Sequence, residues 1–479
     1  MELKRISVVG MGRLGAPMAA CFAWKGFPTV GVDVDPGKVR ALNQGIAPIH
    51  EPRLPEVIHA ARGRLAATLD YETAIRMSDV TFIVVPTPSK DDGAFSLEHV
   101  LETAKQIGAA LRKKANYHLI VLTSTVMPGA TEDKVKPMLE SSSGKKCGDG
   151  FGLCYSPEFI ALGSVIRDFL IPDFILIGES DSEAGTMLAG LYESVCDNHP
   201  PFARMNIINA ELTKLAVNTF VTTKITYANM LARLCERLPG AHVDVVTSAL
   251  GLDSRIGPKY LKGAIGYGGP CFPRDNRAFA NLAHAIGAPA TLAEVTDLLN
   301  RQQIQWLAAT VKQRLPRGQR VGILGLAYKP HSDVVEKSQG LMLAQALAGD
   351  GIPVIAYDPE AAENARRVLS GPVALAASID ECIQRAAVVV VTTPWEEFKR
   401  LTLYDFVQMG AERVVMDCWR LYEGMAQPPG VVYHPIGIGE NPAENGQPDY
   451  HGQTLAVFNA NAESTGNTHA HAVHLSETL

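Results

Sequence analysis

A glycine-rich turn near the N-terminus constrains this chain more than any other feature of its sequence. An apolar run at Ile6–Val9 leads into GMGRLG at residues 10–15, and a stretch typical of a helix follows. Gly10, Gly12 and Gly15 permit a tight turn and a close approach of the backbone to a pyrophosphate. The N-terminus of the following helix favours that negative charge. The pattern predicts a dinucleotide-binding fold.

A carboxylate at the end of the next apolar run refines this prediction. Thr29–Val32 ends at Asp33, whose side chain can bind both ribose hydroxyls and would repel a 2′-phosphate. We therefore expect NAD rather than NADP. Further apolar runs of strand length alternate with helix-like segments, which is typical of a parallel, doubly wound sheet. These runs are residues 80–85, 119–122 and 174–177.

The opening pattern returns in the C-terminal part of the chain. RVGILGLAYK, which starts at Arg320, has the form of a strand and a glycine-containing turn, and GIPVIAYDP (351–359) matches GFPTVGVDVDP (26–36). The second turn keeps only Gly322 and Gly325, which favours a site for a nucleotide substrate over a second NAD site.

The segment between the two copies has a different character. Residues 206–238 contain no glycine or proline and predict one long helix, and more helix is expected up to Gln313. The predicted fold class is α/β, with two Rossmann-like doubly wound domains joined by a central helical domain. The expected N-terminal, central and C-terminal domains and a disordered tail cover residues 1–203, 204–315, 316–455 and 456–479.

Composition disfavours several other classes of protein. The 479 residues carry a net charge of −6, so no strong basic field attracts nucleic acid. No run of about 20 apolar residues predicts a membrane span. The eight cysteines include no Cys-x-x-Cys pair, which favours reduced cytoplasmic thiols over a zinc site or a disulfide scaffold. We expect no metal, because the tail histidines are scattered: His469, His471 and His474.

The most informative segment for chemistry is KGAIGYGGPCFPRD, residues 262–275. Its glycines let the backbone approach a ligand, and Cys271 follows them directly. A helix that starts near Pro270 would lower the pKa of the Cys271 thiol and place Asp275 on the same face. A lone cysteine is usually a small core residue, but these neighbours favour a nucleophile.

The cysteine segment resembles the catalytic motif of the UDP-glucose/GDP-mannose dehydrogenase family, in the form typical of UDP-glucose 6-dehydrogenases. The likeness covers about residues 1–440. Other segments match family motifs in the same order: HEPRLPEVI (50–58), VVPTPS (84–89), STVMPG (124–129), SPEF (156–159), ELTKLAVN (211–218) and LGLAYKP (324–330).

The resemblance implies a four-electron oxidation of a sugar's primary alcohol to a carboxylate, with two NAD per sugar and a cysteine-bound intermediate. It assigns the nucleophile to Cys271. Lys214 and Asn218, four residues apart on the expected helix, would stabilise a developing oxyanion. The remaining implied catalytic residues are Asp275 and Glu158, as proton acceptors, and Thr125, which would hold the hydrolytic water.

The resemblance also implies how the two ligands and a second subunit are bound. The expected cofactor-binding residues are Gly10, Gly12, Gly15, Asp33, Lys38, Thr87 and Thr125. The residues expected to bind the UDP-sugar are Glu158, Phe159, Lys214, Asn218, Arg255, Tyr260, Lys262, Gly268, Lys329 and Arg420. The long helix implies at least a homodimer, in which Arg255 would reach the neighbouring subunit's substrate.

Four residues depart from the family pattern. Leu162 stands where UDP-glucose enzymes usually have Glu, and Phe174, Val335 and Trp419 stand where the family usually has Arg. UDP-glucose is the expected substrate, with a UDP-N-acetylhexosamine or GDP-mannose as alternatives. Two other classes are a two-electron hydroxyacid dehydrogenase, which would not need Cys271, and a non-catalytic nucleotide-sugar binding protein.

Overall fold

The computed structural model describes residues 4–439, which fall into two compact units. The first unit comprises residues 4–226 and 265–435, and the second comprises 227–264 and 436–439. The tail expected at 456–479 lies outside the described residues. None of the helices in residues 4–439 combines the length and the apolar character that crossing a membrane requires.

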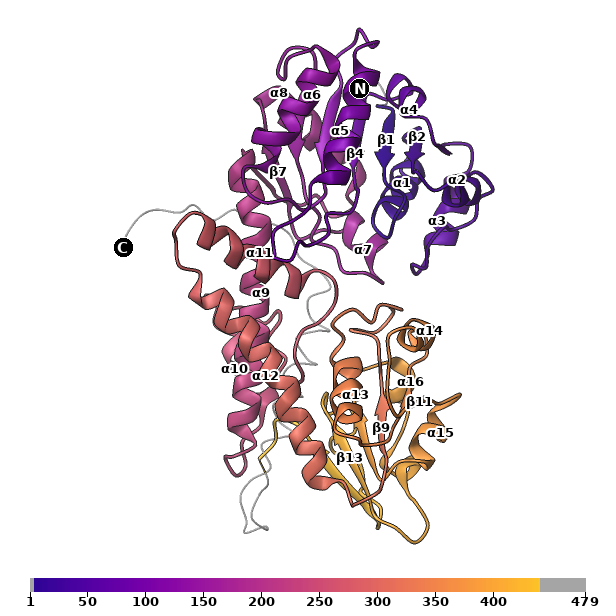
Figure 1. The fold of residues 1–479 in the computed structure, drawn as a ribbon, viewed down its shortest axis with the longest axis vertical. Coiled ribbons are helices and arrows are strands. Elements are labelled where there is room, and N and C mark those ends of the chain that lie inside the picture. Colours follow the sequence, from indigo (N-terminus) through magenta and orange to yellow (C-terminus); the bar gives the residue numbers. More distant parts are fainter. Residues whose placement is uncertain (1–3, 440–479) are drawn as a thin grey trace, which may run out of the picture. The chain divides into compact units, whose positions relative to one another are not determined.

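An eight-stranded sheet organises the N-terminal part of the first unit (Figure 1). Its order is β3-β2-β1-β4-β5-β6-β7-β8, and Ile6 of β1 pairs with Thr29 on one side and Val80 on the other. The strands are β1 (Ile6–Val9), β2 (Thr29–Val32), β3 (Leu65–Thr68), β4 (Val80–Ile83), β5 (Leu119–Leu122), β6 (Gly152–Tyr155), β7 (Ile175–Glu179) and β8 (Phe202–Asn206).

Apolar residues on both faces of this sheet require helices on both sides. The strands ISVV, VTFI and LIVL are buried at every position, as expected for a sheet covered on two faces. One core contains residues of α1 (Gly15–Trp24), α3 (Leu54–Ala60), α7 (Val165–Leu170) and α8 (Ser182–Val195). The other contains residues of α4 (Tyr71–Met77), α5 (Glu98–Leu111) and α6 (Lys136–Ser143).

One strand pair breaks the parallel pattern. β6 and β7 are antiparallel, with Tyr155 opposite Gly178. In an antiparallel pair the connection leaves and enters the sheet at the same edge. The connecting residues 156–174, which include SPEF, are therefore kept at the carboxyl end of β6. This is the end at which ligands bind in sheets of this type.

The chain leaves the first sheet through α9 (Ile207–Cys235), a helix of 29 residues. Residues 207–226 of α9 belong to the first unit, as do α11 (Phe272–Ala285) and α12 (Thr291–Arg314). α11 and α12 pack against each other, and α12 also packs against α13 (Gln339–Gly349).

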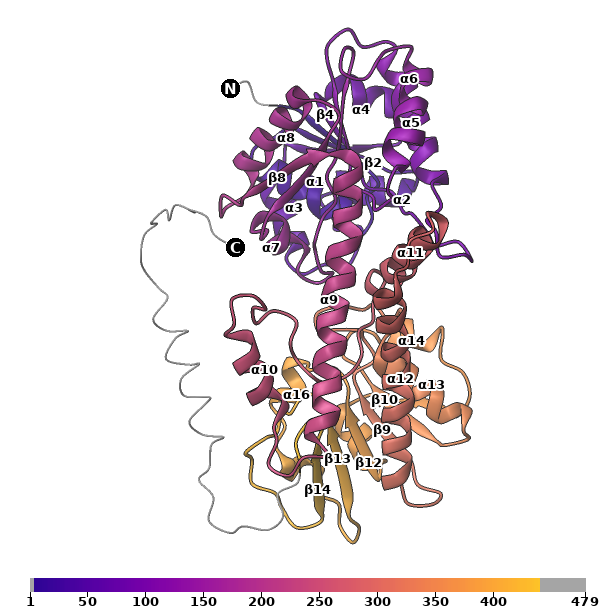
Figure 2. The ribbon, with the colours of Figure 1, turned by 90° about the vertical axis from the view of Figure 1, so that its left-hand side faces the viewer.

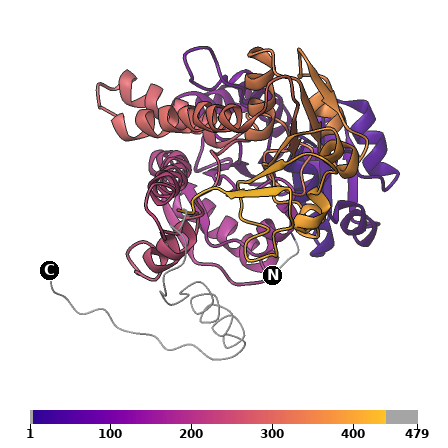
Figure 3. The ribbon, with the colours of Figure 1, turned by 90° about the horizontal axis from the view of Figure 1, so that it is seen from below.

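A second, fully parallel sheet has the order β11-β10-β9-β12-β13-β14. Its strands lie in the orange to yellow part of the ribbon (Figures 2 and 3). This order is that of a Rossmann sheet. The strands are β9 (Val321–Leu324), β10 (Val354–Tyr357), β11 (Val373–Leu375), β12 (Val388–Val391), β13 (Arg413–Asp417) and β14 (Val431–Pro435). The helices after α13 are α14 (Ala362–Arg366), α15 (Ile379–Gln384), α16 (Glu396–Lys399) and the 3-10 turn Leu403–Phe406.

The second unit is small and mainly helical. It contains the end of α9, the helix α10 (Val243–Gly251) and the loop that follows it. Ala232, Cys235 and Val243 form its apolar core. The N–H of Val243 donates a 2.9 Å hydrogen bond to the carbonyl of Gly437, which ties the segment 436–439 to the unit.

The predicted fold class is confirmed, including two Rossmann-like sheets and a long helix between them. Six strands were not predicted, namely β3, β6 and β8 of the first sheet and β11, β13 and β14 of the second. β3 and β8 are partly exposed, so they lack a continuous buried apolar run, and β6 begins with Gly152, which weakens its strand signal. The antiparallel pairing of β6 with β7 was also not expected.

Candidate active site

The glycine-rich turn has the geometry that a dinucleotide requires. Gly10 has a φ of +99°, and a Cβ there would lie 2.4 Å from the carbonyl oxygen of Val84. A Cβ on Gly15 would lie 1.8 Å from the carbonyl oxygen of Gly10, so only glycine fits either position. A Cβ on Gly12 would meet nothing within 4 Å, which leaves open space beside the backbone where the pyrophosphate is expected.

Asp33 lies at the end of β2 and faces this turn. Its Oδ2 accepts a 2.7 Å hydrogen bond from the N–H of Met11, and its Oδ1 accepts one of 2.9 Å from the N–H of Asp35. Lys38 Nζ lies 3.3 Å from Oδ2. The structure thus brings Asp33 and Lys38 together next to the glycine-rich turn.

Two threonines lie at the carboxyl ends of neighbouring strands. Thr87 follows β4 and Thr125 follows β5, and the hydroxyl of Thr87 donates a 2.8 Å hydrogen bond to the carbonyl of Thr125. This contact places both expected cofactor residues at the same edge of the sheet.

The cysteine loop is held by side chains from two other helices. Asn300 of α12 accepts from the N–H of Tyr267 at 2.8 Å and donates to its carbonyl at 2.9 Å. Gln339 of α13 donates to the same carbonyl at 3.0 Å. The N–H of Gly269 donates to the carbonyl of Glu336 at 2.9 Å. The loop that carries Cys271 is therefore fixed by tertiary contacts.

Gly268, expected to bind substrate, packs closely against the C-terminal part of this unit. A Cβ on Gly268 would lie 2.3 Å from the carbonyl oxygen of Lys337, and a Cβ on Gly269 would lie 2.7 Å from the ring of Tyr328. These contacts require glycine at both positions. A cavity of about 690 Å³ opens beside the loop, lined by Thr87, Tyr267, Gly269, Arg274, Glu336 and Lys337 among others.

Cys271 is the N-cap residue of α11, as the sequence predicts. It remains exposed, and the N–H of Asp275 donates to its carbonyl at 2.8 Å. The expected lowering of its pKa is wrong. Although part of the residue reaches solvent, desolvation by the surrounding protein raises the pKa of the Cys271 thiol. The charge of Asp275 raises it further, and the charges of Arg274 and Lys214 offset this only in part.

Asp275 is fully buried and accepts two charge-assisted hydrogen bonds. Asn218 Nδ2 donates to Oδ2 at 2.6 Å, and Arg274 Nε donates to Oδ1 at 2.9 Å. Asn218 comes from α9 and Asp275 from α11, so this contact joins the long helix to the helix that Cys271 begins. The Arg274 guanidinium also lies 4.9 Å from the centre of the Phe95 ring.

Lys214 lies one helical turn before Asn218 on α9. Its Nζ donates a 2.6 Å hydrogen bond to the backbone carbonyl of Glu158 and lies 4.4 Å from the centre of the Phe159 ring. Burial lowers the pKa of Lys214, while Asp275 and Cys271 raise it. The charges of Lys214 and Cys271 therefore act on each other directly.

Glu158 is partly buried and follows the carboxyl end of β6. Burial raises its pKa to about 7, although a hydrogen bond from Tyr192 and the charge of Lys214 both lower it. The Tyr192 hydroxyl donates to Oε1 at 3.0 Å. Glu158 can therefore exchange a proton near neutral pH.

The other expected substrate residues are divided between the two units. Lys329 is half-buried in the first unit, where burial lowers its pKa and Asp168 and Glu51 raise it. Arg420, also in the first unit, is buried and has a φ of +60°. Arg255, Tyr260 and Lys262 belong to the second unit, in which Arg255 pairs with Asp253 and Lys262 with Asp244.

Sequence reasoning did not assign a role to two residues of this site. Arg274 stands inside the cysteine motif, and its charge next to Asp275 was the available signal. Tyr192 lies in the middle of α8 and gives no local signal, because only the fold brings it to Glu158. Phe174, a departure from the family pattern, stacks on Phe159 with ring centres 4.9 Å apart.

Comparison with known proteins agrees with this geometry. Three models of the UDP-glucose/GDP-mannose dehydrogenase family match the chain: the NAD binding domain over residues 4–196, the central domain over 208–302 and the UDP binding domain over 322–424. A UDP-glucose 6-dehydrogenase of Haloferax volcanii is 38% identical over 420 residues, which cover 87% of this chain and 96% of the relative.

Two further relatives show the breadth of the likeness. A GDP-mannose 6-dehydrogenase of Pseudomonas putida is 34% identical and covers 83% of this chain and 93% of its own. The solved structure of a UDP-glucose dehydrogenase from Pyrobaculum islandicum is 33% identical, covers 91% of this chain and 98% of its own, and superposes with a TM-score of 0.82. The chain belongs to the UDP-glucose/GDP-mannose dehydrogenase family and carries its NAD-binding domain.

Proposed function

We propose that this protein is a UDP-glucose 6-dehydrogenase, which oxidises UDP-glucose to UDP-glucuronate with two NAD through a thioester on Cys271. The observation that carries the proposal is the grouping around Cys271. Asp275 is held by Asn218 at 2.6 Å, and Lys214 exerts its charge on both Cys271 and Asp275. A protein that only binds a nucleotide sugar has no need of this set.

The residues of the N-terminal sheet suit NAD. Open space at Gly12 and the close packing of Gly10 and Gly15 admit a pyrophosphate, and Asp33 offers a carboxylate to the ribose hydroxyls. When bound, NAD accepts the hydride in each of the two oxidations.

The first oxidation turns the primary alcohol into an aldehyde. The C–H bond breaks as a hydride leaves, and the hydroxyl proton passes to a base. Lys214 has a lowered pKa, so it can donate a hydrogen bond to the oxygen or accept the proton through water. Glu158, whose pKa is about 7, lies beside it and can relay the proton to solvent.

Cys271 then forms a bond to the aldehyde carbon. The thiol proton leaves as the C–S bond forms, and the carbonyl oxygen gains a negative charge or a proton. Lys214 and the Asn218 amide, one helical turn apart, can both stabilise that oxygen. The second oxidation removes a hydride from this thiohemiacetal carbon and a proton from its oxygen, which gives a thioester.

Hydrolysis completes the reaction. Water adds to the thioester carbon and loses a proton, the C–S bond breaks, and the thiol is regenerated as the carboxylate leaves. Asp275 lies one helical turn from Cys271 and can orient the water or accept its proton. Thr125 is our proposed second contact for this water.

The part of the chain that matches the UDP binding domain, residues 322–424, contains two of the proposed contacts to the UDP group. Lys329 and Arg420 can bind phosphate or nucleotide oxygens of UDP. Arg255, Tyr260 and Lys262 are proposed to bind UDP-glucose, with Arg255 acting on the substrate of a neighbouring subunit.

The apolar side chains on α9 support at least a dimer. Ile208, Leu212 and Phe220 are 46%, 41% and 64% exposed, although they are large and apolar. They are spaced by multiples of four residues and so follow one side of the helix. A second copy of α9 would remove this surface from water.

NADH formation with limiting UDP-glucose tests the proposal. Two NADH per UDP-glucose, with all turnover lost in Cys271→Ser, would support the four-electron route. One NADH per sugar would contradict the thioester. Phe174 packs on Phe159 where the family usually has Arg, so GDP-mannose and UDP-N-acetylhexosamines are assayed alongside. A higher kcat/KM with GDP-mannose or a UDP-N-acetylhexosamine would identify that compound as the substrate in place of UDP-glucose. No turnover with any of these sugar nucleotides would favour a binding protein.

A further inference from the structure

The loop between β9 and α13 touches both the cofactor turn and the cysteine loop. We call residues 331–338 the strap. At one end, the carbonyl oxygen of His331 packs against Gly163, where a Cβ would lie only 2.0 Å away. At the other, the carbonyl of Glu336 accepts from the N–H of Gly269, two residues before Cys271. His331 and Lys337 both have a positive φ, 59° and 50°. Such backbone conformations in non-glycine residues persist where the surroundings impose them.

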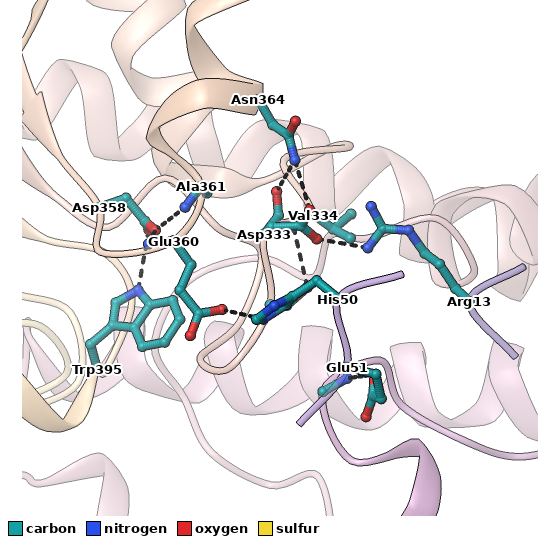
Figure 4. A network of polar contacts seen from close by, with 12 residues as sticks. Arg13, His50, Glu51, Asp333, Val334, Asp358, Glu360, Ala361, Asn364 and Trp395 are labelled. Carbon is teal, nitrogen blue, oxygen red and sulfur yellow. Dashed lines mark hydrogen bonds and ion pairs between the residues drawn. The ribbon is translucent and has the colours of Figure 1, made fainter. Parts of the chain in front are cut away.

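The middle of the strap pairs with the glycine-rich turn. Arg13, the fourth residue of GMGRLG, donates from Nη1 to Oδ1 of Asp333 at 2.7 Å (Figure 4). Asn364 Nδ2 donates to Oδ2 of Asp333 at 3.0 Å and to its backbone carbonyl at 2.9 Å. Asp333 is thus held by Asn364 as well as by Arg13, with one carboxylate oxygen bonded to each.

Arg13 lies where the cofactor's negative charge is expected. α1 begins at Gly15, and the open space at Gly12 lies next to Arg13 in the chain. A pyrophosphate bound at this helix N-terminus therefore lies within reach of the Arg13 side chain. A guanidinium has five N–H donors. The side chain is 45% exposed, and Asp333 is its one hydrogen-bond acceptor within residues 4–439. Donors remain for a phosphate oxygen.

We propose that Arg13 and Asp333 are positioning residues for the cofactor's pyrophosphate. The Arg13 guanidinium bridges a phosphate oxygen and the Asp333 carboxylate, and so fastens the strap over the cofactor. Because the same strap holds the cysteine loop through Glu336 and Gly269, one contact serves both the cofactor and the nucleophile. Val335, which stands where the family usually has Arg, packs against the C-terminal core. In this chain Arg13 of the glycine-rich turn supplies the positive charge next to the cofactor instead.

The simplest alternative is that Arg13 and Asp333 form an ordinary surface ion pair with no role in cofactor binding. Such pairs contribute about 0–1 kcal/mol to stability. The molecule offers a matched control. His50 Nε2 lies 3.1 Å from Oε2 of Glu360 and joins the same two sheet-bearing parts of the unit, without involving the glycine-rich turn (Figure 4). Removing this pair with Glu360→Gln should leave cofactor affinity unchanged.

The test is a fluorescence titration of the full chain with NADH in the absence of sugar, so its result does not depend on which sugar the enzyme oxidises. Arg13→Ala should weaken NADH binding about tenfold, the lower range for a hydrogen bond to a charged group. Arg13→Lys should recover part of this loss. Asp333→Asn should weaken NADH binding by a smaller factor. The double variant Arg13→Ala/Asp333→Asn should bind NADH no more weakly than Arg13→Ala alone.

Each alternative result overturns the proposal. Unchanged affinity in Arg13→Ala would make the pair structural. Tighter binding in Asp333→Asn would mean that Asp333 competes with the cofactor for Arg13. Losses that add in the double variant would show that the two residues act independently. Thermal melts establish that each variant is folded, and Arg13→Gln replaces Arg13→Ala if the latter does not fold.

Discussion

Asn218 Nδ2 donates a 2.6 Å hydrogen bond to Oδ2 of Asp275, and both residues are buried. The bond joins α9 to α11, the helix of which Cys271 is the N-cap residue. A buried carboxylate that loses a donor is costly, because its charge then lacks compensation.

Asn218→Ala should therefore lower kcat by about 10- to 100-fold, which corresponds to about 1.5–3 kcal/mol for a hydrogen bond to a charged group. NADH formation at saturating NAD and sugar nucleotide measures this loss. Asn209→Ala, an exposed asparagine on the same helix, is the control and should keep wild-type kcat. Equal kcat in the two variants would mean that Asp275 needs no support from Asn218.

The raised pKa of Glu158 predicts a pH dependence of both activity and stability. If Glu158 acts as a base, kcat should rise as the pH passes through about 7. Glu158→Gln should remove that rise. A carboxyl group with a raised folded-state pKa binds more protons when folded than when unfolded, so its contribution to stability falls as the pH rises from about 4.5 to about 7.

Melting temperatures of wild type and Glu158→Gln between pH 5 and pH 8 provide the second measurement. The variant should gain stability relative to wild type as the pH increases. A constant difference in melting temperature would show that the pKa of Glu158 in the folded protein is close to the ordinary value for a glutamate.

Local motifs allowed the residues of this site to be named from the sequence, because each motif places its own residues. GMGRLG and Asp33 specify a strand, a turn and a carboxylate within 30 residues, and Cys271 at the start of α11 follows from the glycines and prolines around it. The hydrogen bonds that hold the cysteine loop in place could not be predicted. Gln339 reaches Tyr267 across 72 positions of sequence, and no local pattern encodes that contact.

The pKa of Cys271 was mispredicted for a related reason. The position at a helix N-terminus suggests a stabilised thiolate. Desolvation and the charge of Asp275 act in the opposite direction, and the pKa is raised. Their strength depends on packing by segments that lie far apart in the sequence.

The charges around Cys271 predict how its reactivity shifts with pH. Arg274 lowers the pKa of this thiol and Asp275 raises it. The alkylation rate by iodoacetamide, followed by mass spectrometry of the Cys271 peptide, should therefore shift to higher pH in Arg274→Met and to lower pH in Asp275→Asn. Arg277→Met on the same helix should leave the profile in place. Identical profiles in all variants would mean that burial alone controls this pKa.

The two Rossmann-like sheets use their second-strand carboxylates differently. Asp358, after β10, accepts from the N–H groups of Leu326, Ala327, Glu360 and Ala361 and from the indole N–H of Trp395. Its oxygens are saturated by protein donors. Asp358→Ala should lower the free energy of unfolding by about 3 kcal/mol, because several buried donors lose their acceptor.

Asp33→Ala should weaken NADH binding and should lower the free energy of unfolding by less than Asp358→Ala, because only the N–H groups of Met11 and Asp35 lose their acceptor. Urea denaturation and NADH titration of both variants separate the two roles. The titration of wild type should give one NADH per chain. A second NADH site that disappears in Asp358→Ala would assign cofactor binding to the C-terminal sheet as well.

The exposed face of α9 predicts how the chain associates. Phe220 is 64% exposed, the most exposed of the three apolar residues Ile208, Leu212 and Phe220. A charge buried in an apolar interface without a partner is strongly unfavourable, so Phe220→Glu should shift the mass measured by light scattering from at least a dimer towards a monomer. Val34→Glu provides the control, because Val34 is 84% exposed and lies outside α9. If both Phe220→Glu and Val34→Glu keep the wild-type mass, the subunits do not associate through this face of α9.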